Sequence, residues 1–181
     1  MRNLRKTAFL CLFLVLFQSI NSHATETTLQ GKVVQVKDGD TVVISPLEGG
    51  HLFTCRLYGI DAPETSSSRF RRPGQPYGEE AKKELKELIL DQTVEVTLTG
   101  KKTYRPKDCI IRNDGTDVNL EMVKRGYAWA YRHYLRGLYA SEYLDAESEA
   151  RAKKLGLWQD DNPTPPWEFR RLNLKGHNET H

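Results

Sequence analysis

The chain has 181 residues, 38% of them hydrophobic, and a formal net charge of +3 at pH 7. The three excess positive charges belong to Arg2, Arg5 and Lys6, and the chain beyond residue 24 carries 24 basic and 24 acidic residues. A neutral chain of this kind argues against capture of nucleic acid by bulk charge, so a polyanion would have to bind through local patches.

The first 24 residues have the pattern of a signal peptide. A basic start precedes an apolar run from Ala8 to Phe17 and the small-x-small sequence Ser22-His23-Ala24. The apolar run is shorter than the roughly 20 residues that span a bilayer. We therefore expect export to the periplasm or the medium and no membrane span in the mature chain, with a retained N-terminal anchor as the alternative. Residues 25–160 suffice for one domain, and 161–181 would form a partly disordered extension.

Apolar periodicity and turn residues predict the secondary structure. In chain order, the predicted elements are strands at 31–37, 41–44 and 52–58, a helix at 79–90, strands at 94–98 and 109–112, and helices at 120–134 and 139–154. Five antiparallel strands with a helix after the third match the OB-fold. We predict an α+β protein, mainly a five-stranded OB-fold barrel with three helices.

The aromatic residues of the C-terminal third are expected to serve packing. We assign Tyr131 and Tyr134 to helix packing, and Trp129 and Trp158 to the core. Beyond Trp158 the chain turns to proline, asparagine and charge, so we expect an ordered contact at Pro165-Pro166-Trp167 followed by a frayed tail.

Three acidic residues and one arginine crowd an otherwise apolar, strand-like stretch: Asp40, Arg56, Asp61 and Glu64. Carboxylates packed this closely repel one another and lose solvation, and a hard divalent cation with oxygen ligands relieves both costs. An arginine beside such a cation suits bidentate binding of a phosphate. The pattern therefore indicates a metal-dependent phosphodiesterase. Asp38, next to Gly39, is expected only to form the turn.

Five motifs resemble the staphylococcal nuclease (thermonuclease) family, over a stretch from about Gly31 to Trp158. They are DGDT at 38–41, RLYGIDAPE at 56–64, YGEEA at 77–81, DVN at 117–119 and GLW at 156–158. The resemblance implies an OB-fold enzyme that cuts DNA and RNA with little sequence preference and leaves 3′-phosphate ends. We expect it to act as a monomer.

The resemblance also implies roles for individual residues. Asp40 and Asp61 match the two carboxylates that bind Ca²⁺, and Ala62 stands where a backbone carbonyl completes the calcium ligands. Glu64 matches the carboxylate that activates or orients the attacking water. Arg56 matches the first of two phosphate-binding arginines.

The second of these arginines is where the sequence departs from the family, which has Tyr-Gly-Arg where this chain reads Tyr-Arg-Pro-Lys. Counting back from Asn119 without gaps places Pro106 at the arginine position. Deleting the glycine aligns Arg105 instead, and a bulge before Asn119 then absorbs one residue. We predict Arg105 in this role, with Lys107 as the fallback, and Tyr104 as a nucleotide contact.

The segment that leaves Glu64 carries three arginines, Arg69, Arg71 and Arg72, which we expect to contact the phosphate backbone of the substrate. The alternative to a nuclease is a non-catalytic OB-fold module that binds nucleic acid or protein. The altered Tyr-Gly-Arg segment favours that alternative, whereas the presence of all three acids favours the enzyme.

Two cysteines remain after the leader, Cys55 and Cys109. No C-x-x-C pair or suitably spaced histidines indicate a zinc site. In a barrel of this family the third and fifth strands are neighbours, so the two thiols could meet. Both a disulfide and two buried free thiols remain compatible with the sequence.

Overall fold

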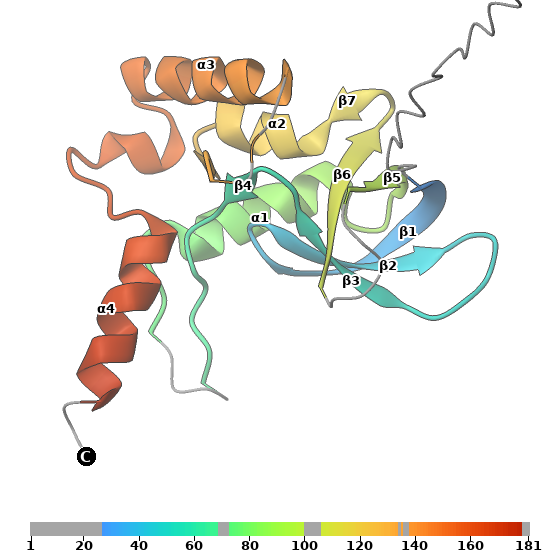
Figure 1. Ribbon diagram of the computed structural model, residues 1–181, viewed down its shortest axis with the longest axis horizontal. Helices are drawn as coiled ribbons and strands as arrows, with labels where there is room; N and C mark the ends of the chain where they lie inside the picture. Colours follow the sequence, from blue (N-terminus) through green and yellow to red (C-terminus); the bar gives the residue numbers. More distant parts are fainter. Residues whose placement is uncertain (1–26, 69–72, 100–105, 134, 136–137, 179–181) are drawn as a thin grey trace, which may run out of the picture.

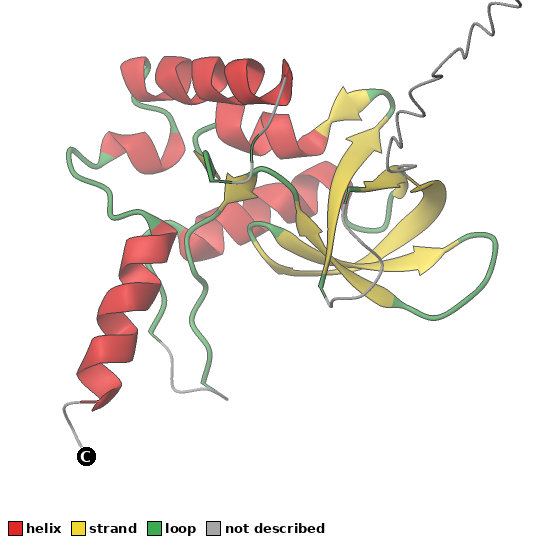
Figure 2. Cartoon of the chain, in the orientation of Figure 1, coloured by secondary structure: helices red, strands yellow, loops and turns green. Residues whose placement is uncertain are grey.

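The computed structural model describes residues 27–68, 73–99, 106–133, 135 and 138–178. Figure 1 shows a β-barrel at the right, helices α2 and α3 above its left end, and α4 extending downward at the far left. Figure 2 shows the same division between the strands and the helices. Among the described helices, none is long and apolar enough to cross a membrane.

Five strands form the barrel: β1 (Thr27–Asp38), β2 (Thr41–Pro46), β3 (Phe53–Leu57), β5 (Thr93–Leu98) and β6 (Lys107–Asn113). They are paired in the order β3-β2-β1-β5-β6, and β3 also pairs with β6, which closes the sheet. The closing pair is parallel and the other pairs are antiparallel. The predicted OB-fold barrel is confirmed, with one parallel pair that we did not predict.

Beyond the barrel, β4 (Ile60–Asp61) pairs with β8 (Trp129–Ala130), and β7 (Thr116–Asp117) pairs with β6. The prediction of one helix from 120 to 134 is wrong, because α2 covers only Val118–Lys124. Gly126 ends this helix at a positive φ of 75°, and a Cβ there would lie 2.3 Å from the Leu155 carbonyl oxygen. The chain then continues as β8, which places Trp129 beside Asp61.

The other helices are α1 (Gly78–Ile89), α3 (Leu138–Ala152), a 3₁₀ turn (Gly156–Gln159) and α4 (Pro166–Asn178). The described chain thus has four α-helices where three were predicted. The fourth begins within the ordered contact expected at Pro165-Pro166-Trp167 and continues into the segment expected to fray. Its first residue, Pro166, is buried and suits the start of a helix, and Trp167 packs against Trp129 with ring centroids 6.4 Å apart.

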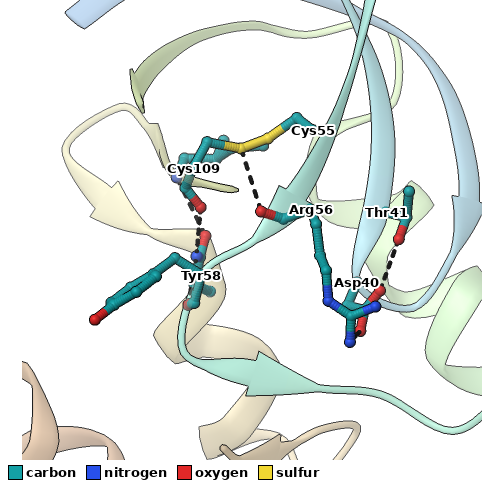
Figure 3. The surroundings of a disulfide bond; sticks show 8 residues. Asp40, Thr41, Cys55, Arg56, Tyr58 and Cys109 are labelled. Atoms are coloured by element: carbon teal, nitrogen blue, oxygen red, sulfur yellow. Dashed lines mark hydrogen bonds and ion pairs between the residues drawn. A yellow bond between two sulfur atoms is a disulfide. The ribbon is translucent and has the colours of Figure 1, made fainter. Parts of the chain in front are cut away.

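The closing pair of strands is tied in two further ways. Cys55 of β3 and Cys109 of β6, both 0% exposed, form a disulfide with their Cα atoms 6.1 Å apart (Figure 3). Asn119 of α2 is also 0% exposed and donates hydrogen bonds of 3.0 Å to the carbonyls of Tyr58 and Cys109. These contacts hold the exit of β3, and with it the residues that follow, in a fixed position.

Candidate active site

Asp40 lies in the turn between β1 and β2, where its backbone N–H donates to the Asp38 carboxylate at 3.2 Å. Asp38 therefore forms the turn, as predicted. The Asp40 carboxylate, in a residue only 4% exposed, accepts hydrogen bonds from Thr41 Oγ1 at 2.7 Å and from the Ala62 backbone N–H at 3.3 Å. Burial raises the pKa of the Asp40 carboxyl to about 8, and the nearby Arg56 opposes the rise.

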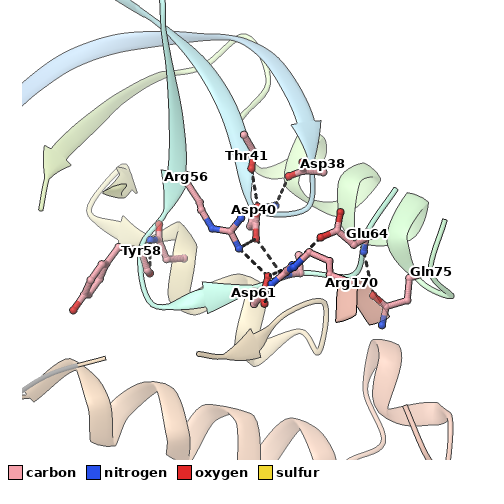
Figure 4. Close-up of polar contacts among 11 residues, drawn as sticks. Asp38, Asp40, Thr41, Arg56, Tyr58, Asp61, Glu64, Gln75 and Arg170 are labelled. Carbon is pink, nitrogen blue, oxygen red and sulfur yellow. Dashed lines mark hydrogen bonds and ion pairs between the residues drawn. The ribbon is translucent and has the colours of Figure 1, made fainter. Parts of the chain in front are cut away.

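Arg56 joins Asp40 to Asp61. Its Nη2 lies 3.0 Å from Asp40 Oδ2 and 2.8 Å from Asp61 Oδ1 (Figure 4). Burial lowers the pKa of Arg56, but ion pairing with Asp40 and Asp61 outweighs burial and raises it. Arg56 comes from β3 and Asp61 from β4 directly after it, so the short connection between the two strands brings the charges together.

Glu64 is positioned by its backbone. Gln75 donates its backbone N–H to the Glu64 carbonyl at 2.8 Å, and its side-chain oxygen accepts from the Glu64 N–H at 3.3 Å. Gly78, the first residue of α1, packs directly against the same carbonyl, because a Cβ on Gly78 would lie 2.3 Å from the Glu64 oxygen. The start of α1 therefore fixes where the Glu64 side chain leaves the backbone.

Arg170 is the site residue that sequence reasoning missed. From α4 its guanidinium donates to both oxygens of Asp61, at 3.0 and 2.8 Å, and to Glu64 Oε1 at 2.7 Å (Figure 4). Hydrogen bonds to Asp61 and Glu64 raise the pKa of Arg170. The sequence offered one signal, the run Pro-Pro-Trp-Glu-Phe-Arg-Arg, but the contact spans 109 residues and no local pattern predicts it.

These side chains line or border a cleft of about 570 Å³. Asp40, Arg56, Glu64 and Arg170 line it, while Asp61 lies beneath them with 0% exposure. Tyr131, which we had assigned to helix packing, also lines the cleft. Such a cleft combines an aromatic ring, carboxylates and two guanidinium groups, a composition that suits a phosphorylated, base-bearing ligand.

Only some of the remaining predicted residues lie at the cleft. Ala62 lines the cleft, but Lys107 lies elsewhere, with its Nζ 4.5 Å from the centroid of the Phe53 ring. Pro106, the residue just before β6, also lines the cleft. Five predicted site residues lie outside the described part of the chain: Arg69, Arg71, Arg72, Tyr104 and Arg105. Tyr134, assigned to helix packing, lies outside it as well.

Comparison with known proteins places this fold and cleft in a family. The family model for staphylococcal nuclease homologues matches residues 54–160. The chain belongs to the staphylococcal nuclease family. An uncharacterized endonuclease of Haemophilus influenzae is 36% identical over 170 residues, which cover 94% of this chain and 86% of that protein. A micrococcal nuclease of Shigella flexneri is 34% identical over 158 residues, covering 82% of this chain and 84% of that protein.

The three carboxylates at the cleft can be compared with the ligands that a metal ion prefers. The oxygen donors of Asp40, Asp61 and Glu64 suit a hard cation such as Ca²⁺ rather than a soft one. Within the described residues no three acidic, histidine or cysteine side chains form a ready-made metal cluster. Arg56 and Arg170 lie between the three carboxylates instead. The donor set fits a hard cation, provided that the carboxylates exchange an arginine for it.

Proposed function

We propose that the protein is an exported, calcium-dependent endonuclease that hydrolyses DNA and RNA with low sequence specificity and leaves 3′-phosphate ends. The observation that carries the proposal is that Arg56, paired with Asp40 and Asp61, lies at the same cleft as Glu64 in a staphylococcal nuclease fold. The two relatives named as nucleases or endonucleases, each matched over more than four-fifths of its length, support the same activity.

In this proposal Asp40, Asp61 and the Ala62 carbonyl hold Ca²⁺. Bound there, the ion would act as a Lewis acid that polarises the phosphate and offsets its charge. Two observations support these ligands: Asp40 and Asp61 both reach Nη2 of Arg56, and the Ala62 backbone hydrogen-bonds to Asp40. A hard cation would also relieve the burial cost of the two carboxylates.

Glu64 is proposed to take a proton from the attacking water. The water oxygen forms a bond to phosphorus while the bond from phosphorus to the 5′ oxygen breaks. The leaving 5′ oxygen takes up a proton from solvent, and the phosphate stays on the 3′ oxygen of the upstream nucleotide. General-base catalysis of this kind contributes ~10²–10⁴-fold to the rate. The hold of Gln75 and Gly78 on the Glu64 backbone supports a positioned base.

Arg56 is proposed to bind the non-bridging oxygens of the phosphate, with Arg105 as the second arginine. A guanidinium group donates in a fork that matches two phosphate oxygens, and it remains charged throughout the reaction. Tyr104, Arg69, Arg71 and Arg72 would contact the neighbouring nucleotides. Lys107, whose ammonium group lies over Phe53, would strengthen binding of the nucleic acid only through the long-range attraction of its charge.

Export is proposed from the leader at residues 1–24 together with the disulfide. A structural disulfide forms in the periplasm or outside the cell more readily than in a reducing cytosol. The pairing of Cys55 with Cys109 therefore supports the same destination as the leader.

The experiment is a cleavage assay on two substrates, supercoiled plasmid and single-stranded RNA. The mature protein is assayed first in Ca²⁺ and then in excess chelator. Both substrates should be cut in Ca²⁺ and left intact with chelator. Labelled ends should carry 3′-phosphate groups. Asp40→Ala should abolish calcium binding in a calorimetric titration and should abolish cleavage.

The matched control is Asp145→Ala, which removes an exposed carboxylate on α3, away from the cleft. This variant should cut like the wild type. Full cleavage in chelator would overturn the metal dependence. If the protein bound nucleic acid but did not cut it with any of the divalent metals added, the result would instead support the non-catalytic OB-fold module.

A further inference from the structure

Helix α4 reaches the active site through one face. Trp167 and Arg170 are three residues apart and so share that face. The Trp167 ring lies 5.3 Å from the Tyr131 ring and 6.4 Å from the Trp129 ring, between centroids. Just before the helix, the Thr164 carbonyl accepts a hydrogen bond from the side chain of Gln75, the residue that also holds Glu64. The helix is thus docked by aromatic packing at its start and by Arg170 one turn later.

Arg170 already donates hydrogen bonds to Asp61, a proposed metal ligand. Asp61 is 0% exposed, and its Oδ1 accepts from Arg56 at 2.8 Å and from Arg170 at 3.0 Å. Its Oδ2 accepts from Arg170 at 2.8 Å. A cation that approaches Asp61 therefore meets a guanidinium group already bound to both oxygens. It must replace at least one of these contacts before it can coordinate.

The positions of the two arginines in the fold indicate which one gives way. A divalent cation at Asp61 would stand beside two guanidinium groups, and like charges this close repel one another. Arg56 is anchored in the barrel strand β3 and bonds to Asp40 as well as Asp61. Arg170 stands on a helix that continues away from the body (Figure 1), so its release disturbs less of the fold.

We propose that Arg170 is an internal cation of the metal-free site, which a divalent metal must displace from Asp61, so that metal binding loosens α4. This inference rests on the metal dependence proposed above. The C-terminal helix is then part of the metal equilibrium: α4 docked with Arg170 at Asp61 disfavours the metal, and the metal disfavours the docked helix.

The test measures calcium affinity by calorimetry on the mature wild type and on Arg170→Gln. Loss of a charge-assisted hydrogen-bonding partner changes such an affinity by ~10–100-fold. Arg170→Gln should therefore bind Ca²⁺ at least ~10-fold more tightly than the wild type. Arg171→Gln removes the neighbouring, exposed arginine of the same helix and is the matched control, which should keep the wild-type affinity.

A second variant keeps the charges and loosens only the helix. Trp167→Ala removes the ring that packs on Tyr131 and Trp129, so Arg170 should reside less at Asp61 and Ca²⁺ should bind more tightly, by less than in Arg170→Gln. This variant decides the question if Arg170→Gln fails to fold. In the wild type, saturating Ca²⁺ should also speed hydrogen exchange of the backbone amides of residues 167–173.

The outcomes separate this inference from the proposed function. Equal calcium affinity in the wild type, Arg170→Gln and Trp167→Ala would overturn the inference and leave the metal-dependent enzyme in place. Weaker binding in Arg170→Gln would also overturn it, because Arg170 would then support the metal. No calcium binding by any of the proteins would overturn the proposed function and the inference with it.

Discussion

At the scale of single residues, acidic and basic side chains alternate across the site. Asp40 bonds to Arg56, Arg56 to Asp61, Asp61 to Arg170 and Arg170 to Glu64. Each of the three carboxylates has a guanidinium partner, and this pairing offsets the cost of taking a charged group out of water.

Glu64→Gln tests the proposed general base, since the change keeps the shape of the side chain and removes its charge. We expect turnover to fall by ~10²–10⁴-fold, with calcium and nucleotide affinity changed far less. Single-turnover cleavage and calorimetry on the same preparation measure the two effects. A variant that cuts at nearly the wild-type rate would show that Glu64 only supports the structure.

Arg105→Ala tests the proposed second arginine. If Arg105 binds the phosphate, its loss should lower turnover as severely as Arg56→Ala, by ~10²-fold or more, because both stabilise the charge of the transition state. Lys107→Ala, which removes the ammonium group over Phe53, should change only the salt dependence of binding. A silent Arg105→Ala would favour the register that puts Pro106, a residue that lines the cleft, at the arginine position.

At the scale of secondary structure, the elements differ in how far the sequence predicted them. The five barrel strands were predicted to within a few residues, because alternation and turn residues are local signals. The predicted helix at 120–134 failed because Gly126 adopts a positive φ of 75° and the next residues pair with β4. Helix α4 was missed because its docking depends on Trp129 and Tyr131, which lie more than 30 residues earlier in the sequence.

The site residues divide in the same way. Asp40, Arg56, Asp61 and Glu64 stand within one short stretch, so their crowding could be read from the sequence. Arg170 could not be found in this manner, because it reaches the site only after α4 docks. Distance along the chain, rather than chemistry, limited the prediction.

Gly78→Ala tests the packing of α1 against Glu64. A Cβ at Gly78 would lie 2.3 Å from the Glu64 carbonyl oxygen, so either the start of α1 or the backbone at Glu64 must shift. We expect a loss of ~1–3 kcal/mol in the free energy of unfolding and a lower turnover. Denaturant unfolding and the plasmid cleavage assay measure these effects.

The control for this variant is Glu79→Ala, one residue further along α1 and exposed. It should leave the free energy of unfolding within ~0.5 kcal/mol of the wild type. Wild-type stability and turnover in Gly78→Ala would contradict a role of this contact in placing Glu64.

At the scale of the whole molecule, the barrel and the site depend on one closure. Strand β3, which carries Arg56, meets β6 as the parallel pair that closes the barrel. The chain segment between Cys55 and Cys109 includes β4, Glu64, α1 and β5. The disulfide that joins its two ends therefore encloses most of the elements that build the cleft.

Removing this cross-link should destabilise the fold with little effect on the chemistry. The two cysteines are 54 residues apart, and the chain-entropy account gives about 4 kcal/mol for closing a loop of that length. Cys55→Ala with Cys109→Ala should lower the free energy of unfolding by about that amount, because the unfolded chain gains freedom. Both residues are 0% exposed, and alanine avoids burying a hydroxyl in their place. Denaturant unfolding with and without reductant measures the effect.

Reductant should destabilise the wild type and leave the stability of the double variant unchanged. Two free thiols in the exported wild type, or equal stability of the two proteins without reductant, would contradict the prediction. Below its unfolding midpoint the double variant should still cut plasmid, since Asp40, Arg56, Asp61 and Glu64 keep their hydrogen-bond and ion-pair partners.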